Sequence, residues 1–203
     1  MDDTSLSLLA RVRQSSDRQA WDRLMAIYTP LLGVWLRKYD VQATDVDDLV
    51  QEVLLVVATD LKSFEHGGQP GVFRAWLRAI LVNRLRGFWR ARGRRPLVRG
   101  DSDIDWRLAQ LEDPASEISQ LWNRQHDQHV ARQLLALVEP HFAPATWKAF
   151  YRAALEGVRA DVVASELGIS VNAVFIAKSR VLSRLRQEAE GLVESSSGFL
   201  ANC

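Results

Sequence analysis

The stretch ADVVASELGISVNAVFIAKSRVLSRLRQ, from Ala160 to Gln187, contains two helix patterns joined by a short turn. Small residues, Ala164 and Gly168, stand where two helices would cross closely, and Ser170 can cap the second helix by accepting hydrogen bonds from its first amides. The inward positions of that helix are apolar: Val174, Ala177, Val181 and Leu185. A helix, a glycine turn, an N-cap serine and a second helix in this order predict a helix-turn-helix.

The other side of the second helix carries candidate DNA contacts. These residues are Asn172, Phe175, Ile176, Ser179 and Arg180. Major-groove recognition uses the N-terminal turns of such a helix, while Lys and Arg further along hold phosphates. Phe175 and Ile176 can contact thymine methyl groups. The alternative is a plain helical hairpin with a solvated basic face.

The composition describes an ordinary globular protein. Of 203 residues, 47% are hydrophobic and 25% are charged, and the net charge is +1. The longest apolar runs, 31–36 and 53–58, are far shorter than a bilayer span, and the first residues lack a basic leader. The single cysteine, Cys203, excludes an internal disulfide. We therefore expect a cytoplasmic protein without a membrane contact, and few glycines and prolines favour an all-α fold.

Helical periodicity and composition divide the chain into two helical domains. The first domain is expected over residues 5–96, with helices starting near residues 5, 17, 44 and 72. An acidic flexible linker is expected over 97–119, a helix-turn-helix domain over 120–190, and a flexible tail over 191–203.

Charge is segregated along the first domain and the linker. Residues 74–99 contain nine arginines and no acid, whereas residues 40–65 contain seven acids against one lysine. Residues 101–127 again hold seven acids against two arginines. This segregation suggests two different partner surfaces, and the arginine-rich segment implies an anionic partner.

The acidic segment contains a candidate docking face. Asp48, Gln51, Glu52 and Leu55 follow i, i+3, i+4, i+7 spacing and therefore share one side of a helix. A face of this kind can dock another helix. The alternative is a solvated acidic helix face.

The arginine-rich segment interleaves cations with aromatic rings. Single-stranded nucleic acid needs both, because guanidinium groups bind phosphates and rings stack on bases. Trp76 lies on the apolar stripe and is expected in the core, so Trp89 is the better stacking candidate. The candidate strand-binding residues are Arg74, Arg78, Asn83, Arg86, Trp89 and Arg90.

Other chemistry is not indicated. His126 and His129 share a helix face with Asp127 nearby, but without a further ligand we interpret them as a solvated face and expect no metal site. The sequence contains no nucleotide-binding glycine loop, nucleophile elbow or zinc motif. We expect no cofactor and no enzymatic activity.

Three stretches together resemble a known family. DLVQEV at 48–53 is similar to a polymerase-binding helix, and FRAWL at 73–77, followed by Ile80 and Asn83, is similar to a promoter-melting helix. Residues 160–187 align with the C-terminal helix-turn-helix of the same family. The chain resembles a sigma-70 RNA polymerase sigma factor of the extracytoplasmic-function (ECF) group. Residues 142–147 and 177–181 resemble a subgroup frequent in planctomycetes.

The resemblance implies a function in transcription initiation. Asp48, Gln51, Glu52 and Leu55 would bind the clamp helices of the largest subunit of core RNA polymerase. The helix from 72 to 90 and the loop from Phe64 to Gly71 would capture the melted −10 strand, with one base flipped out. The helix-turn-helix would hold the −35 duplex. Members of the group commonly have an anti-sigma factor, although no residue here identifies one.

One departure keeps other functions open. Most ECF recognition helices carry a basic triplet directly after the equivalent of Val174, whereas here Lys178-Ser179-Arg180 comes three residues later. The triplet therefore faces another direction, and −35 recognition should differ. The alternatives are a free-standing helix-turn-helix regulator that acts without polymerase, and a degenerate sigma-like interaction module.

Overall fold

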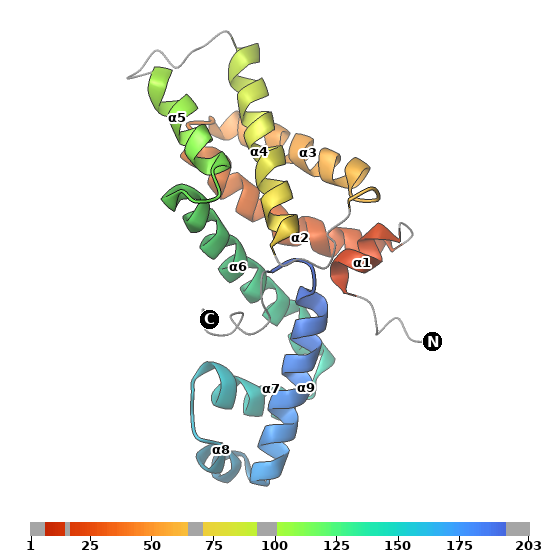
Figure 1. Ribbon diagram of the computed structural model, residues 1–203. Coiled ribbons are helices and arrows are strands. Elements are labelled where there is room, and N and C mark those ends of the chain that lie inside the picture. The colour runs from red at the N-terminus through yellow and green to blue at the C-terminus, as the bar shows by residue number, and fades with distance from the viewer. Residues whose placement is uncertain (1–6, 15–16, 65–70, 93–100, 194–203) are drawn as a thin grey trace.

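The computed structural model describes residues 7–14, 17–64, 71–92 and 101–193, and all regular structure in these ranges is helical (Figure 1). A 3-10 turn, η1 (Glu139–His141), and a π-helical turn, η2 (Tyr151–Leu155), flank the seventh helix. The prediction of an all-α chain is confirmed for these residues. The helices are α1 (Leu8–Arg13), α2 (Arg18–Lys38), α3 (Ala43–Asp60), α4 (Val72–Ala91), α5 (Asp101–Glu112), α6 (Glu117–Val138), α7 (Pro144–Phe150), α8 (Ala160–Leu167) and α9 (Val171–Ala189).

Helices α2, α3 and α4 pack together through apolar stripes at helical spacing. Asp17 caps α2 by accepting a hydrogen bond from the Ala20 amide at 2.9 Å. Gly71 has a φ of 77°, a left-handed conformation that glycine adopts without strain, and the chain enters α4 from it. The stripes are buried, which fixes the opposite faces of α3 and α4 toward the surface. Members of the stripes include Leu24, Leu32, Leu49, Val53, Val57, Leu77, Leu81 and Leu85.

The predicted flexible linker over residues 97–119 is wrong where the structure describes it. Residues 101–112 form α5, and α6 begins at Glu117; residues 97–100 lie outside the described part of the chain. Ile104, Leu108 and Leu111 are buried at i, i+4, i+7 spacing between the acidic residues. This apolar stripe packs α5 against α4 and α6, and the acids Asp103, Asp105 and Glu112 are exposed.

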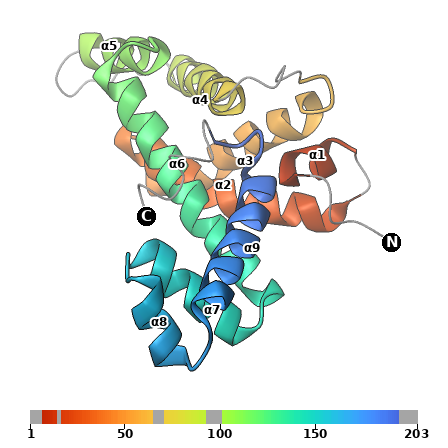
Figure 2. The same cartoon turned by 60° about the horizontal axis from the view of Figure 1, so that its bottom comes forward.

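Helix α6 connects the two predicted domains through a shared core. Trp122 of α6 lies edge-on to Trp35 of α2, with ring centroids 5.0 Å apart. Both indoles are buried, together with Val130 and Leu134 farther along α6. Figure 1 and Figure 2 show α6 running from the upper group of helices, α1 to α5, down to α7 and α9. In this structure the helix-turn-helix unit is therefore packed onto the first domain by its leading helix.

The helix-turn-helix is confirmed. Gly168 ends α8 with a left-handed φ of 63°, and the Ser170 hydroxyl accepts a hydrogen bond from the Ala173 amide at 3.1 Å. Val163, Ala164 and Val174 are buried at the crossing of α8 and α9. The expected inward residues of α9, from Val174 through Leu185, are all buried as well.

The predicted flexible tail is wrong at its start. Leu192 and Val193 are buried, and Gly191, with a φ of 82°, lies so close to α1 that an added Cβ would be 2.9 Å from a Leu9 methyl group. Burial of these apolar side chains beside α1 fixes the end of α9 on the first domain. Residues 194–203 lie outside the described part of the chain.

Within the described ranges, no single helix is long and apolar enough to cross a membrane. Only α8 and α9 taken together reach that length and composition, and a bend of 104° separates them.

Candidate functional site

The four candidate docking residues lie on the exposed side of α3. Asp48, Gln51, Glu52 and Leu55 are all exposed, and the Leu55 side chain is 65% accessible. The opposite stripe of the helix, which includes Leu49 and Val53, is buried against α2 and α4. An exposed leucine beside two carboxylates gives this face both an apolar contact and a negative field.

A groove of about 400 Å³ separates α3 from α4. Asp48 and Glu52 line it from α3, and Asn83, Arg84 and Gly87 line it from α4. An ion pair of 4.0 Å joins Glu52 to Arg84 across the groove. Two of the four candidate polymerase-binding residues, Asp48 and Glu52, therefore border the same groove as the candidate base-reading residue Asn83. These residues lie on separate helices, and no spacing in the sequence predicts that they meet.

The arginine-rich segment is not the uncompensated cationic surface that its sequence suggested. Arg86 binds Glu112 of α5 through two hydrogen bonds of 2.7 and 3.1 Å, and Arg92 pairs with Asp45 of α3. Arg90 is exposed, and its Nε donates to the backbone oxygen of Arg86 at 3.3 Å. Acids distant in sequence thus neutralise part of the run. Arg94, Arg95 and Arg99 lie outside the described residues.

Arg74 and Arg78 are buried beneath α6. The Arg74 guanidinium donates to Asp127 at 2.5 Å, and Arg78 donates to the Asn123 side chain at 3.5 Å. The Arg74 side chain is only 4% exposed. In this arrangement α6 covers the two candidate strand-binding residues nearest the start of α4.

The predicted solvated histidine face on α6 is wrong. His126 is fully buried, with Nδ1 2.9 Å from Asp127 and Nε2 3.1 Å from the Tyr28 hydroxyl. His129 lies 2.7 Å from the Ile27 backbone oxygen. These contacts direct both rings toward α2 rather than toward solvent. The described residues contain no cluster of three or more groups that could hold a metal ion.

Burial sets the ionisation of this polar network. Desolvation lowers the pKa of His126, more than its hydrogen bond to Asp127 raises it. Burial alone would raise the pKa of Asp127, but the hydrogen bonds from His126 and Arg74 outweigh it and hold that pKa below its ordinary value. Burial also raises the pKa of Tyr28. The network therefore contains a neutral histidine, which donates to an ionised aspartate and accepts from the tyrosine hydroxyl.

The aromatic candidates occupy mixed environments. Trp76 is half-buried and stacks on Phe64, with ring centroids 4.5 Å apart, so it packs against the core without being enclosed. Trp89 is also half-buried, lies edge-on to Phe88, and has no hydrogen-bond partner for its buried Nε1 among the described residues. Residues 65–70 of the predicted strand-capturing loop lie outside the described part of the chain. Asn83 is exposed.

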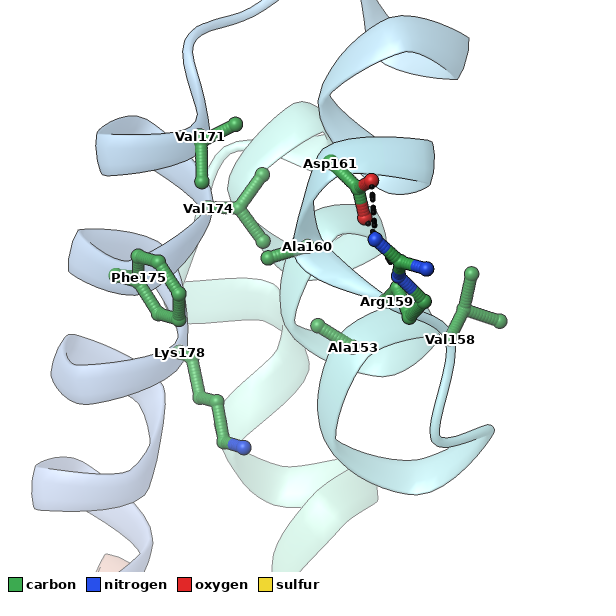
Figure 3. Close-up of a pocket in the computed structure, with 9 residues that line it drawn as sticks. All are labelled: Ala153, Val158, Arg159, Ala160, Asp161, Val171, Val174, Phe175 and Lys178. Atoms are coloured by element: carbon green, nitrogen blue, oxygen red, sulfur yellow. Dashed lines mark hydrogen bonds and ion pairs between the residues drawn. The ribbon is translucent and has the colours of Figure 1, made fainter.

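The five candidate residues of the recognition helix all lie exposed on α9. Beside them a pocket of about 420 Å³ opens between α9 and the start of α8. Figure 3 shows Phe175 and Lys178 on α9 at one side of this pocket, and Arg159, paired with Asp161, at the other. The pocket is otherwise lined by small and aliphatic side chains such as Ala153 and Val171.

Residues 24–95, which include most of α2 and all of α3 and α4, match the family model of sigma-70 region 2. These residues form a sigma-70 region 2 domain. The exposed face of α3, the groove and α4 all lie within it.

Named relatives extend the similarity beyond this domain. The chain is 28% identical to RNA polymerase sigma factor CnrH of Cupriavidus metallidurans, over 94% of this chain and 95% of that protein. It is 30% identical to the ECF RNA polymerase sigma-E factor of Haemophilus influenzae, over 57% of this chain and 62% of that protein. The Escherichia coli sigma-E factor is 33% identical over 50% of this chain and 49% of its own length. Together these similarities support the interpretation of this chain as an ECF sigma-70 factor.

Proposed function

We propose that this chain binds core RNA polymerase and directs promoter-specific initiation, with α4 holding melted −10 DNA and α9 holding the −35 duplex. The observation that carries the proposal is the face of Asp48, Gln51, Glu52 and Leu55, which is exposed on a sigma-70 region 2 domain. The similarity to one protein named as an RNA polymerase sigma factor over 94% of this chain supports it.

The α3 face fits the basic clamp helices of the largest polymerase subunit. Its carboxylates can attract and orient a cationic helix. Leu55 supplies an apolar contact, because docking removes water from its side chain. Because Glu52 is only 4.0 Å from Arg84, a docked cation would compete with an existing ion pair. Exposed pairs of this kind are worth about 0.2–1 kcal/mol, so the competition costs little.

The −10 surface combines residues that are exposed with residues that α6 covers. Asn83 and Arg90 are exposed, and Arg86 and Trp89 are half-buried beside them on α4. Asn83 offers both a donor and an acceptor for a base edge. Arg74 and Arg78 can join this surface only if α6 moves away from α4, because both now bind α6.

The −35 surface is the exposed side of α9. Asn172, Phe175, Ile176, Ser179 and Arg180 occupy its N-terminal half, the part of a recognition helix that reaches base edges. The planctomycete-like subgroup, an anti-sigma partner and a cytoplasmic location remain predictions from the sequence.

A second candidate function is a helix-turn-helix regulator that acts without polymerase. The helix-turn-helix itself favours it, since such a unit can bind an operator unaided. The two functions differ in whether the chain binds specific DNA alone or only together with core polymerase. A sigma factor is specific with core enzyme, whereas a regulator shifts its operator alone.

Run-off transcription with purified core polymerase tests the proposal. We expect promoter-specific transcripts only when the chain is added. Replacing Gln51→Ala together with Glu52→Arg should abolish core binding, because a cation then faces the basic clamp. Glu139→Arg, a charge reversal at another exposed site, is the matched control and should keep core binding. Core binding by the α3 variant, with an unchanged circular dichroism spectrum, would contradict the assigned interface.

A further inference from the structure

Phe175 and Ile176 are large apolar side chains exposed on the outer face of α9, and Val171, one turn before Phe175, is exposed as well. Phe175 is 57% and Ile176 is 45% accessible, although Val174 and Ala177 on either side of them are buried. Exposed apolar area on a helix that is otherwise amphipathic indicates a contact made with a partner. Neither side chain helps to hold the helix-turn-helix together, because the buried set of α9 does so.

The surroundings of this pair are cationic. From Val171 to Gln187 the sequence contains no acid and holds Lys178, Arg180, Arg184 and Arg186. The nearest acid of the helix, Glu188, is buried and pairs with Arg184 at 2.7 Å and with Arg11 at 3.0 Å. Arg180 and Arg186 are exposed. Asp161 of α8 lines the pocket beside Phe175 but is paired with Arg159 at 2.9 Å. The field over the outer face is therefore positive, which suits a polyanion and repels a basic protein surface.

The position of the pair along α9 adds a geometric argument. Ser170 caps the helix and Gly168 sets the turn before it, so the first turns of α9 are held rigidly. Phe175 and Ile176 stand on the second turn, which is within the part of a recognition helix that enters the major groove. Asn172, one turn earlier on the same face, is exposed beside them.

The major-groove edge of DNA offers one apolar group, the C5 methyl of thymine. We propose that Phe175 and Ile176 read thymine methyl groups in the −35 duplex, with Asn172 reading a neighbouring base edge and Arg180 holding the phosphate backbone. This inference rests on the proposed function and specifies its DNA sequence class. An extended protein partner is disfavoured, because the large apolar side chains exposed on α9 are limited to Val171, Phe175 and Ile176, and polar Asn172, Ser179 and Arg180 are exposed among and after them.

Deoxyuridine substitution tests the inference with the holoenzyme. Promoters are first selected from a randomised library by run-off transcription with core polymerase and the full chain. We expect the selected −35 elements to contain thymines at fixed positions. Replacing these thymines by deoxyuridine removes only the methyl group and keeps base pairing. Holoenzyme affinity should fall about fourfold for each contacted methyl group, as expected for one buried carbon.

Two protein variants complete the design. Phe175→Ala with Ile176→Ala should bind thymine and deoxyuridine promoters equally, because the side chains that sense the methyl groups are gone. Both residues are exposed, so the fold should be retained. Leu121→Ala, which truncates an exposed apolar residue on α6, is the matched control and should keep the full discrimination.

The outcomes separate the inference from the proposed function. Absence of any promoter-specific transcription would refute the proposed function itself. Specific transcription by wild-type holoenzyme without a methyl effect would overturn the inference alone, and so would a double alanine variant that retains the effect. Loss of core-polymerase binding in the double variant would assign this face to a protein contact and overturn the inference too.

Discussion

At the scale of single residues, Arg74, Asp127, His126 and Tyr28 form a hydrogen-bonded network in which all but Asp127 are buried. Arg74 and Asp127 are joined at 2.5 Å, and the buried His126 links Asp127 to Tyr28. Buried charges are tolerated only when they are paired and hydrogen-bonded. Replacing one member therefore leaves its partners without that hydrogen bond or ion pair in a buried place, which lowers the free energy of unfolding.

Asp127→Ala should lower the free energy of unfolding by about 2–3 kcal/mol, because it removes the carboxylate that faces the buried Arg74 guanidinium. Urea unfolding monitored by tryptophan fluorescence measures the change. Asp105→Ala, on the exposed side of α5, should change stability by less than about 0.5 kcal/mol. Equal effects of the two substitutions would contradict the assigned role of Asp127.

His126 makes stability depend on pH. Burial lowers its pKa below the ordinary 6.5 in the folded state, so the unfolded chain binds this proton more readily. The contribution of His126 to the free energy of unfolding is therefore fully present above about pH 6.5 and is lost as the pH falls below that value. The free energy of unfolding then changes by at most about 1.4 kcal/mol per pH unit.

His126→Gln should remove that slope between about pH 7 and pH 5, measured by urea unfolding at each pH. This window lies above the ordinary pKa values of Asp and Glu side chains, and the pKa of Asp127 is lowered further. His141→Gln, at an exposed position, should retain the wild-type slope. A slope that survives in the His126 variant would show that another group is responsible.

At the scale of elements, two glycines illustrate how backbone conformation decides the effect of the same substitution. Gly168 has a φ of 63° in the turn before α9, whereas Gly87 lies within α4. An added methyl group would meet no described atom within 4 Å at either position. The two positions therefore differ in conformational energy and not in space.

Gly168→Ala should lower the free energy of unfolding by about 1–2 kcal/mol, because a left-handed conformation strains any side chain. Gly87→Ala should raise it by up to about 1 kcal/mol, because alanine favours the helix. Thermal unfolding of both variants gives the comparison. Shifts of the same sign in both would argue against the described turn.

Helix α5 shows why an acidic composition does not define a linker. Its acids suggested a solvated, irregular segment, but Ile104, Leu108 and Leu111 occur at helical spacing among them and are buried. Periodicity was therefore visible in the sequence, and composition alone was the weaker criterion.

At the scale of the whole molecule, α6 holds the helix-turn-helix unit against the first domain. Besides the contacts to Arg74 and Arg78, Lys38 of α2 donates to Gln125 of α6 at 2.8 Å. The far end of α9 adds a buried ion pair between Arg11 and Glu188. This arrangement covers part of the proposed −10 surface, so strand binding through Arg74 and Arg78 requires the two units to separate.

Joining α2 to α6 covalently should therefore block transcription. Lys38→Cys with Gln125→Cys, in a Cys203→Ser background, can be bridged by a short bismaleimide. We expect the bridged chain to lose at least about tenfold in promoter-specific run-off transcription. The same variant capped with N-ethylmaleimide controls for the modification and should stay active. Full activity of the bridged chain would show that α6 need not move.

The sequence by itself determined the features that depend on neighbours along the chain. Apolar residues at helical spacing produced α2, α3, α4 and α9, and Gly168 with Ser170 produced the turn between α8 and α9. The exposed face of α3 followed from the same spacing, because a helix with one buried stripe must present the opposite residues to solvent.

Only the tertiary structure decided which charges meet and which polar groups are buried. Arg74 and Asp127 are 53 residues apart in the chain, and Arg11 and Glu188 are 177 apart, yet both pairs are in contact. Local periodicity carries no information about such partners. The sequence predicted Arg74 and Arg78 as strand-binding residues and His126 as part of a solvated face, because their burial depends on where α6 packs. That position is set by the shared core of Trp35 and Trp122.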